Sequence, residues 1–101
     1  MKRYYNKLVR DRVPELLEEG GKAHSARKAS EEDIQMYSFK KLQEEIDEFI
    51  ENPSAEEAAD VMEVLNFICY RAGIQAHTIM AETIAKRVSR GAFEIGYILD
   101  W

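Results

Sequence analysis

The spacing of apolar residues along this chain follows the helical period over most of its length. Four stretches show this helical spacing, with polar positions on the opposite faces: residues 13–20, 30–50, 54–72 and 75–88. The fold class is therefore predicted to be all-α, with four helices in one domain over residues 1–101.

Local signals mark where these helices begin and end. Ser30 followed by Asp33 resembles a capping box, with Asp in place of the usual Glu, and Ser54 is placed to cap the third helix. Gly73 is the expected stop of that helix. The connection between the second and third helices is short, which predicts that they fold back as an antiparallel hairpin.

The third helix has the widest apolar surface, as expected for the most buried helix of a bundle. We expect Met62 and Cys69 of this helix to lie in the core of the bundle. Its main apolar face carries Val61, Val64, Leu65, Ile68 and Ala72. The tail from residue 91 to 101 is also apolar, and we expect it to be extended and to pack on the bundle or on a second chain.

Acidic residues occupy matching positions on both arms of the hairpin. Glu45 and Glu48 lie one turn apart on the second helix, and Glu57 and Asp60 lie one turn apart on the third. If Glu48 faces Glu57, Glu45 faces Asp60. Such a cluster repels itself unless a cation binds it. Replacing Asp60 by Asn, or Glu48 by Gln, is then expected to raise the melting temperature of the metal-free protein.

A simpler interpretation exists for each part of this pattern. An acidic run is usually a solvated helix face, and Glu57 is placed to complete a capping box with Ser54. Asp60 is harder to explain in this way, because it falls among apolar residues, where a carboxylate without a partner is unfavourable. The chain lacks the Glu-x-x-His pair of di-iron bundles, and oxygen-only ligands suit Mg²⁺ or Mn²⁺.

The composition of the chain argues against several classes of function. The net charge of −5 argues against general nucleic-acid binding. Cys69 is the only cysteine, which excludes an intrachain disulfide and fits a cytoplasmic location. The basic N-terminus is not followed by an apolar run, so we expect no signal peptide, and no stretch is apolar enough for a membrane span.

Three stretches together resemble one enzyme family. Glu44-Glu45-x-x-Glu48 followed by Glu57-x-x-Asp60 is similar to the EExxE…ExxD signature of the MazG-like nucleotide pyrophosphohydrolases. Residues 5–14, YNKLVRDRVP, and residues 90–93, RGAF, resemble the opening and the ending of its phosphoribosyl-ATP pyrophosphohydrolase-like branch. Two departures are a spacing of eight residues between Glu48 and Glu57, shorter than in many members, and an alanine at position 92 in place of glycine.

The resemblance implies roles for individual residues. The Mg²⁺ ligands would be Glu45, Glu48, Glu57 and Asp60. Glu44 would be an accessory carboxylate, and Glu44 or Glu48 would be the catalytic general base. The contacts to substrate phosphates would be Lys7, Arg10, Lys86 and Arg90. For the last two residues the simpler interpretation is a helix C-terminus that complements its dipole.

The resemblance also implies an activity and an assembly. The activity is Mg²⁺-dependent hydrolysis of the α–β phosphoanhydride of a nucleoside triphosphate, which yields a nucleoside monophosphate and pyrophosphate. The assembly is a four-helix bundle completed by association into a dimer or a dimer of dimers. Phosphoribosyl-ATP is an alternative substrate, and a non-catalytic helical dimerisation module is an alternative function. The sequence leaves open whether the hairpin closes within one chain or across two.

Overall fold

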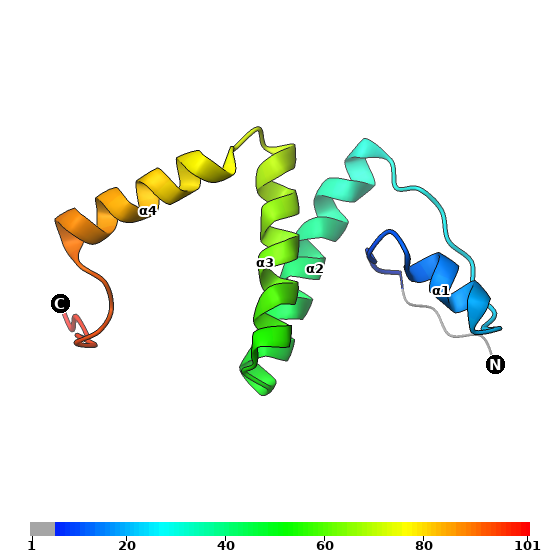
Figure 1. The fold of residues 1–101 in the computed structure, drawn as a ribbon, viewed down its shortest axis with the longest axis horizontal. Coiled ribbons are helices and arrows are strands. Elements are labelled where there is room, and N and C mark those ends of the chain that lie inside the picture. The colour runs from blue at the N-terminus through cyan, green and yellow to red at the C-terminus, as the bar shows by residue number, and fades with distance from the viewer. Residues whose placement is uncertain (1–5) are drawn as a thin grey trace. The chain divides into compact units, whose positions relative to one another are not determined.

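The fold is known from a computed structural model, which describes residues 6–101 and contains four α-helices in that range. Each predicted helix overlaps an observed one along nearly its whole length, and the described residues form no strand. The prediction of an all-α chain is therefore confirmed. The helices are α1 (Val13–Glu19), α2 (Glu31–Glu51), α3 (Ala55–Arg71) and α4 (Ala76–Arg90) (Figure 1).

The predicted caps explain where α2 and α3 begin. The Ser30 hydroxyl accepts a hydrogen bond from the backbone N–H of Asp33 at 3.1 Å, and the Ser54 hydroxyl accepts one from the backbone N–H of Glu57 at 3.2 Å. Each bond satisfies a donor that the first helical turn leaves without a partner. Beyond the end of α3, Gly73 has a φ of 76°, a left-handed conformation that favours glycine and stops the helix.

The chain divides into two compact units, which we describe separately. The first extends to Ile68 and holds α1, α2 and most of α3. The second begins at Cys69 and holds the last turn of α3, α4 and the tail. The prediction of one domain over residues 1–101 stays a prediction.

Within the first unit, α2 and α3 form a helical hairpin (Figure 1). The segment before α1, residues 6–12, is bound to both arms of it. Lys7 Nζ lies 3.2 Å from Glu44 Oε1 on α2, and Arg10 Nη2 lies 2.7 Å from Asp60 Oδ1 on α3. The hairpin and this leading segment together position the acidic residues.

The described residues contain no buried apolar side chain, and the two buried residues are Ser38 and Glu45. Ile50 on α2 is 69% exposed and Met62 on α3 is 55% exposed. The prediction that α3 is the most buried helix, with Met62 in a core, is therefore wrong for the single chain. Cys69, the other expected core residue, is only partly buried. A helix pair buries the stripe along its contact and leaves the flanking apolar positions exposed.

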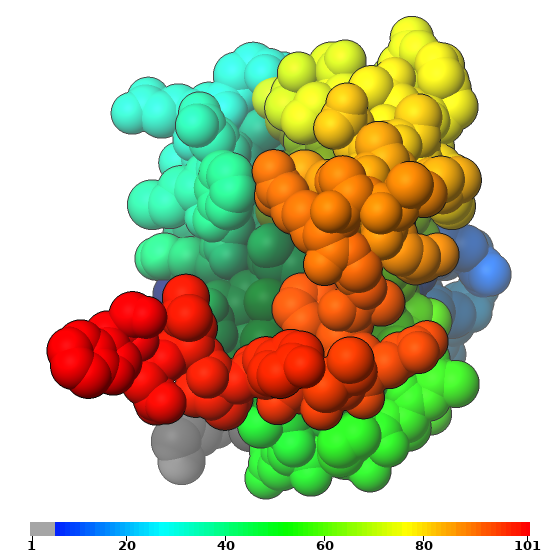
Figure 2. Space-filling model, turned by 90° about the vertical axis from the view of Figure 1, so that its left-hand side faces the viewer, coloured from blue at the N-terminus to red at the C-terminus, as the bar shows by residue number. Residues whose placement is uncertain are grey.

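The tail that follows Gly91 has no helix or strand. Its large apolar side chains are exposed, and Figure 2 shows the end of the tail in red. Its expected packing against a bundle or a second chain stays a prediction. None of the helices in residues 6–101 combines the length and the apolar character that a membrane crossing requires.

Candidate functional site

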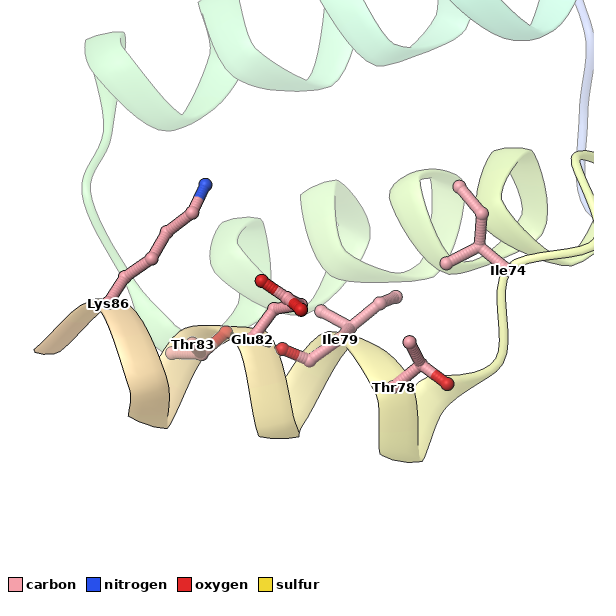
Figure 3. Close-up of a pocket in the computed structure, with 6 residues that line it drawn as sticks. All are labelled: Ile74, Thr78, Ile79, Glu82, Thr83 and Lys86. Carbon is pink, nitrogen blue, oxygen red and sulfur yellow. Dashed lines mark hydrogen bonds between the residues drawn. The ribbon is translucent and has the colours of Figure 1, made fainter.

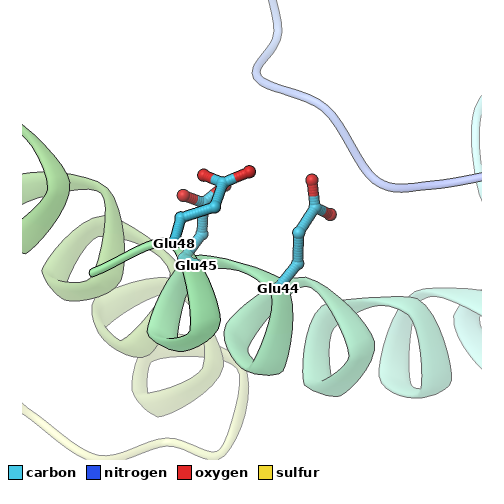
Figure 4. Close-up of side chains that lie close together, drawn as sticks. All are labelled: Glu44, Glu45 and Glu48. Carbon is cyan, nitrogen blue, oxygen red and sulfur yellow. The ribbon is translucent and has the colours of Figure 1, made fainter. Parts of the chain in front are cut away.

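The second helix places three carboxylates together. Glu44, Glu45 and Glu48 each offer an oxygen, and these oxygens lie within 4.8 Å of one another. Figure 4 shows the three side chains standing on the same side of α2. Neighbours on consecutive turns share a helix face, which explains why this spacing brings Glu45 and Glu48 together.

The hairpin adds two carboxylates from α3. Oxygens of Glu45, Glu57 and Asp60 also lie within 4.8 Å of one another, so that Glu45 belongs to both groups. The structure thus brings Glu45 and Asp60 together across the hairpin, as expected from the sequence. Glu48 and Glu57 fall in different groups, which share Glu45 as their common member.

Glu45 is the most enclosed acidic residue of the site. It is 6% exposed, and Lys41 Nζ lies 3.1 Å from its Oε1 atom. Its Oε2 atom is buried and has no hydrogen-bond partner, and the same holds for Oε2 of Glu57. A buried carboxylate oxygen without a partner is energetically unfavourable. Both atoms belong to the group that joins the two helices, and a bound cation would satisfy them. The donor set, carboxylate oxygen alone, fits Mg²⁺ or Mn²⁺.

Three basic side chains neutralise part of the site. Lys41 bridges Glu45 and Glu44, with Nζ 3.5 Å from Glu44 Oε2, and its side chain is only 14% exposed. No role was predicted for Lys41, although a lysine four residues before Glu45 is a signal for an ion pair on one helix face. Lys7 and Arg10 bind Glu44 and Asp60, and their expected contact with phosphates stays a prediction.

Two carboxyl groups hold their protons to higher pH than usual. The pKa of Glu48 is raised above 4.5, first because its protonated carboxyl can donate a hydrogen bond to the Glu45 carboxylate, which has no such bond from Glu48 when both are ionised, and then by the charge of Glu45. The pKa of Glu57 is raised above 4.5, first by desolvation and then by the charge of Asp60. Both pKa values are raised, as expected for carboxyl groups that lie close together without enough positive charge to neutralise them.

Lys86 and Arg90 lie on α4, in the second unit. Figure 3 shows Lys86 on a groove along α4, with aliphatic side chains from the same unit. Their predicted role as phosphate contacts stays a prediction. The groove is lined by Ile74, Thr78, Ile79, Glu82, Thr83 and Lys86.

No protein-family model, curated protein or solved structure matches this chain. The membership of the MazG-like family therefore stays a prediction from residues 5–14, 44–60 and 90–93.

Proposed function

We propose that the chain is a Mg²⁺-dependent nucleotide pyrophosphohydrolase, which cleaves the α–β phosphoanhydride of a nucleoside triphosphate. The observation that carries this proposal is the group of Glu45, Glu57 and Asp60. It contains two buried carboxylate oxygens without partners, on Glu45 and Glu57. A solvated acidic face would leave such oxygens in water, whereas a cation site requires them.

The proposed ligands of the ion are Glu45, Glu48, Glu57 and Asp60. When bound, Mg²⁺ or Mn²⁺ neutralises phosphate charge and favours attack by water. Glu44 is not one of these ligands, and its two oxygens bind Lys7 at 3.2 Å and Lys41 at 3.5 Å. Its role in the proposal is to hold these two lysines next to the site.

Glu48 is the better of the two expected general bases. It is exposed, so water reaches it, and the described contacts include no cation on its carboxylate. Glu44, by contrast, has a lysine at each of its two oxygens. In the proposed reaction Glu48 takes a proton from the attacking water, and the anhydride bond breaks to give pyrophosphate and a monophosphate.

Phosphate binding is proposed for the basic residues at the edge of the site. Arg10 has a 58% exposed side chain beside Asp60, and a guanidinium group there suits the oxygens of a phosphate. Lys7 is proposed to act in the same way. Lys86 and Arg90 belong to the second unit, and a role for them in phosphate binding rests on the family resemblance alone.

A second copy of the chain is proposed to cover the apolar faces of α2 and α3. The support is that the described residues bury no apolar side chain, whereas a stable domain needs such a core. Ile50 and Met62 are among the exposed side chains that a homodimer would cover. The same observation favours the rival function, a non-catalytic helical dimerisation module. Binding of a divalent ion distinguishes the two functions, because a dimerisation module does not require a cation at the oxygens without partners.

The test is a screen of canonical, deoxy and oxidised nucleoside triphosphates and phosphoribosyl-ATP with Mg²⁺, scored for pyrophosphate. We expect pyrophosphate and monophosphate from at least one of them, and loss of activity in Glu57→Gln. Glu63→Gln is the matched control, because Glu63 is exposed on the same helix and belongs to neither carboxylate group. Orthophosphate as the first product would contradict cleavage at the α–β bond. Equal activity of the two variants would contradict the assignment of the site.

A further inference from the structure

The leading segment, residues 6–12, carries a cation to the carboxylates that the two helices gather. Arg10 Nη2 lies 2.7 Å from Asp60 Oδ1, the short distance typical of a charge-assisted hydrogen bond. Asp60 is also a member of the group with the partnerless oxygens of Glu45 and Glu57. The guanidinium group therefore occupies one of the carboxylates that a metal ion would need.

The two cations nearest this group differ in how easily they leave. Lys41 belongs to α2, its side chain is 14% exposed, and it binds Glu45 one helical turn away. Arg10 belongs to a segment without helical structure, and its side chain is 58% exposed. An exposed ion pair contributes little free energy, so little stability is lost when the Arg10 pair opens. Lys41 is thus a fixed counter-charge, whereas Arg10 is removable.

We propose that Arg10 is a cationic plug of the metal site, bound to Asp60 in the metal-free chain and released when a divalent ion takes that carboxylate. The proposal rests on the metal site put forward above and adds its regulation. A guanidinium group and a divalent cation repel each other at a shared carboxylate, so each weakens the binding of the other. Lys7 strengthens the plug, because it attaches the same segment to Glu44 at 3.2 Å.

The plug predicts that removing Arg10 tightens metal binding. The probe is Mn²⁺ alone, titrated without nucleotide at constant ionic strength into the full chain, with free Mn²⁺ followed by electron paramagnetic resonance. Arg10→Gln is expected to bind Mn²⁺ about 1.4- to fivefold more tightly than the parent, the range that an exposed ion pair of about 0.2–1 kcal/mol provides. Arg10→Ala must give the same tightening, since both variants remove the charge.

Arg12→Gln is the matched control for loss of one positive charge. Arg12 lies in the same segment, but its guanidinium binds Glu15, with Nε 3.1 Å from Oε2, and no member of the site. Its affinity for Mn²⁺ is expected to equal that of the parent. Equal tightening by Arg12→Gln would overturn the plug in favour of a general effect of net charge. Unchanged or weaker binding by Arg10→Gln would overturn it as well.

A second readout follows the leading segment directly. Trypsin cleaves the peptide bond after arginine. Release of the Arg10 side chain from Asp60 should make the bond between Arg10 and Asp11 more accessible to the protease. Mn²⁺ is therefore expected to accelerate cleavage after Arg10 in the parent and to have no such effect in Asp60→Asn, where the pair is lost. Cleavage at the same rate with and without Mn²⁺ in the parent would overturn the plug.

The outcomes separate this proposal from the enzymatic one. Tighter Mn²⁺ binding by Arg10→Gln in a protein that hydrolyses no nucleotide supports the plug and contradicts the proposed activity. Hydrolysis with identical Mn²⁺ affinities of Arg10→Gln and the parent supports the activity and overturns the plug. Absence of Mn²⁺ binding in both proteins overturns both.

Discussion

Replacing Lys41 by Met tests whether Glu45 carries a buried charge. Lys41 Nζ lies 3.1 Å from Glu45 Oε1, and Glu45 is 6% exposed. Methionine keeps an unbranched side chain of similar length and a similar helix propensity. The substitution therefore removes the positive charge with little change in packing. Both oxygens of Glu45 would then lack a cation, since its Oε2 atom has no partner already.

The expected effect on stability is large. Removing one partner of a buried ion pair typically costs 3–5 kcal/mol, and we expect about 3 kcal/mol because Lys41 is not fully enclosed. For a chain of this size that loss lowers the melting temperature in EDTA by roughly 12–24 °C. Metal should reverse part of the loss. At a hundred times its dissociation constant an ion stabilises the parent by about 2.7 kcal/mol, and the variant should gain more, because the ion replaces the lost charge.

The assay is a set of thermal melts followed by circular dichroism, in EDTA and in excess Mg²⁺, at one fixed protein concentration. Lys40→Met is the matched control, because Lys40 is the adjacent residue on α2 and is exposed. Its ammonium lies 5.5 Å from the centre of the Tyr37 ring, an exposed contact that contributes about 0.5–1 kcal/mol. If Lys41→Met and Lys40→Met melt together in EDTA, Glu45 is not a buried charge. A smaller Mg²⁺ effect in Lys41→Met than in the parent would refute the proposed replacement of charge.

Two further predictions concern pH and association. The pKa of Glu48 is raised in the folded state. Its favourable contribution to the free energy of unfolding is therefore complete below pH 4.5 and is lost as the pH rises through the pKa of the folded state. In EDTA, the melting temperature of Glu48→Gln relative to the parent should therefore increase as pH rises from 4.5 towards neutral, and a constant difference would contradict the shift. Met62→Lys should convert a homodimer to monomers in sedimentation measurements, because a charge would enter the apolar contact. The control Glu63→Lys should remain dimeric, and two monomeric variants, or a monomeric parent, would contradict the proposed interface.

The helices were predictable because their signals are local. The caps at Ser30 and Ser54 bind backbone groups three residues away, and the apolar period lies within each helix. The approach of Glu45 to Asp60 was predictable for a similar reason. A short connection between two helices leaves few ways for them to pair.

Burial was not predictable in the same way. The apolar pattern of α3 shows which face avoids water, but it does not show what covers that face. Met62 was expected in a core and is 55% exposed. The partners of the acidic residues were also missed. The pair of Arg10 and Asp60 joins residues that are 50 positions apart, and the spacing of charges in the sequence carries no information about such a contact.

This pair changes what Asp60→Asn should do. The sequence alone predicts a higher melting temperature in EDTA, because one of several repelling carboxylates is neutralised. The structure adds an opposing loss, since the amide would give up the charge-assisted bond with Arg10 at 2.7 Å. Both side chains are more than a third exposed, so that loss is about 0.2–1 kcal/mol, similar in size to the repulsion removed at a partly solvated site.

Asp60→Asn should therefore melt close to the parent in EDTA, while Glu57→Gln should melt higher. The described contacts give Glu57 no cation, and its buried Oε2 atom has no partner, so that the glutamine substitution removes an unfavourable charge without losing an ion pair. Both variants should lose the stabilisation by Mg²⁺. When Arg10→Gln is added to both variants, their melting temperatures in EDTA should converge, because Asp60 then also lacks its cation. If Asp60→Asn instead gains as much as Glu57→Gln with Arg10 present, the guanidinium is not bound to Asp60 in solution, and the argument for the plug fails with it.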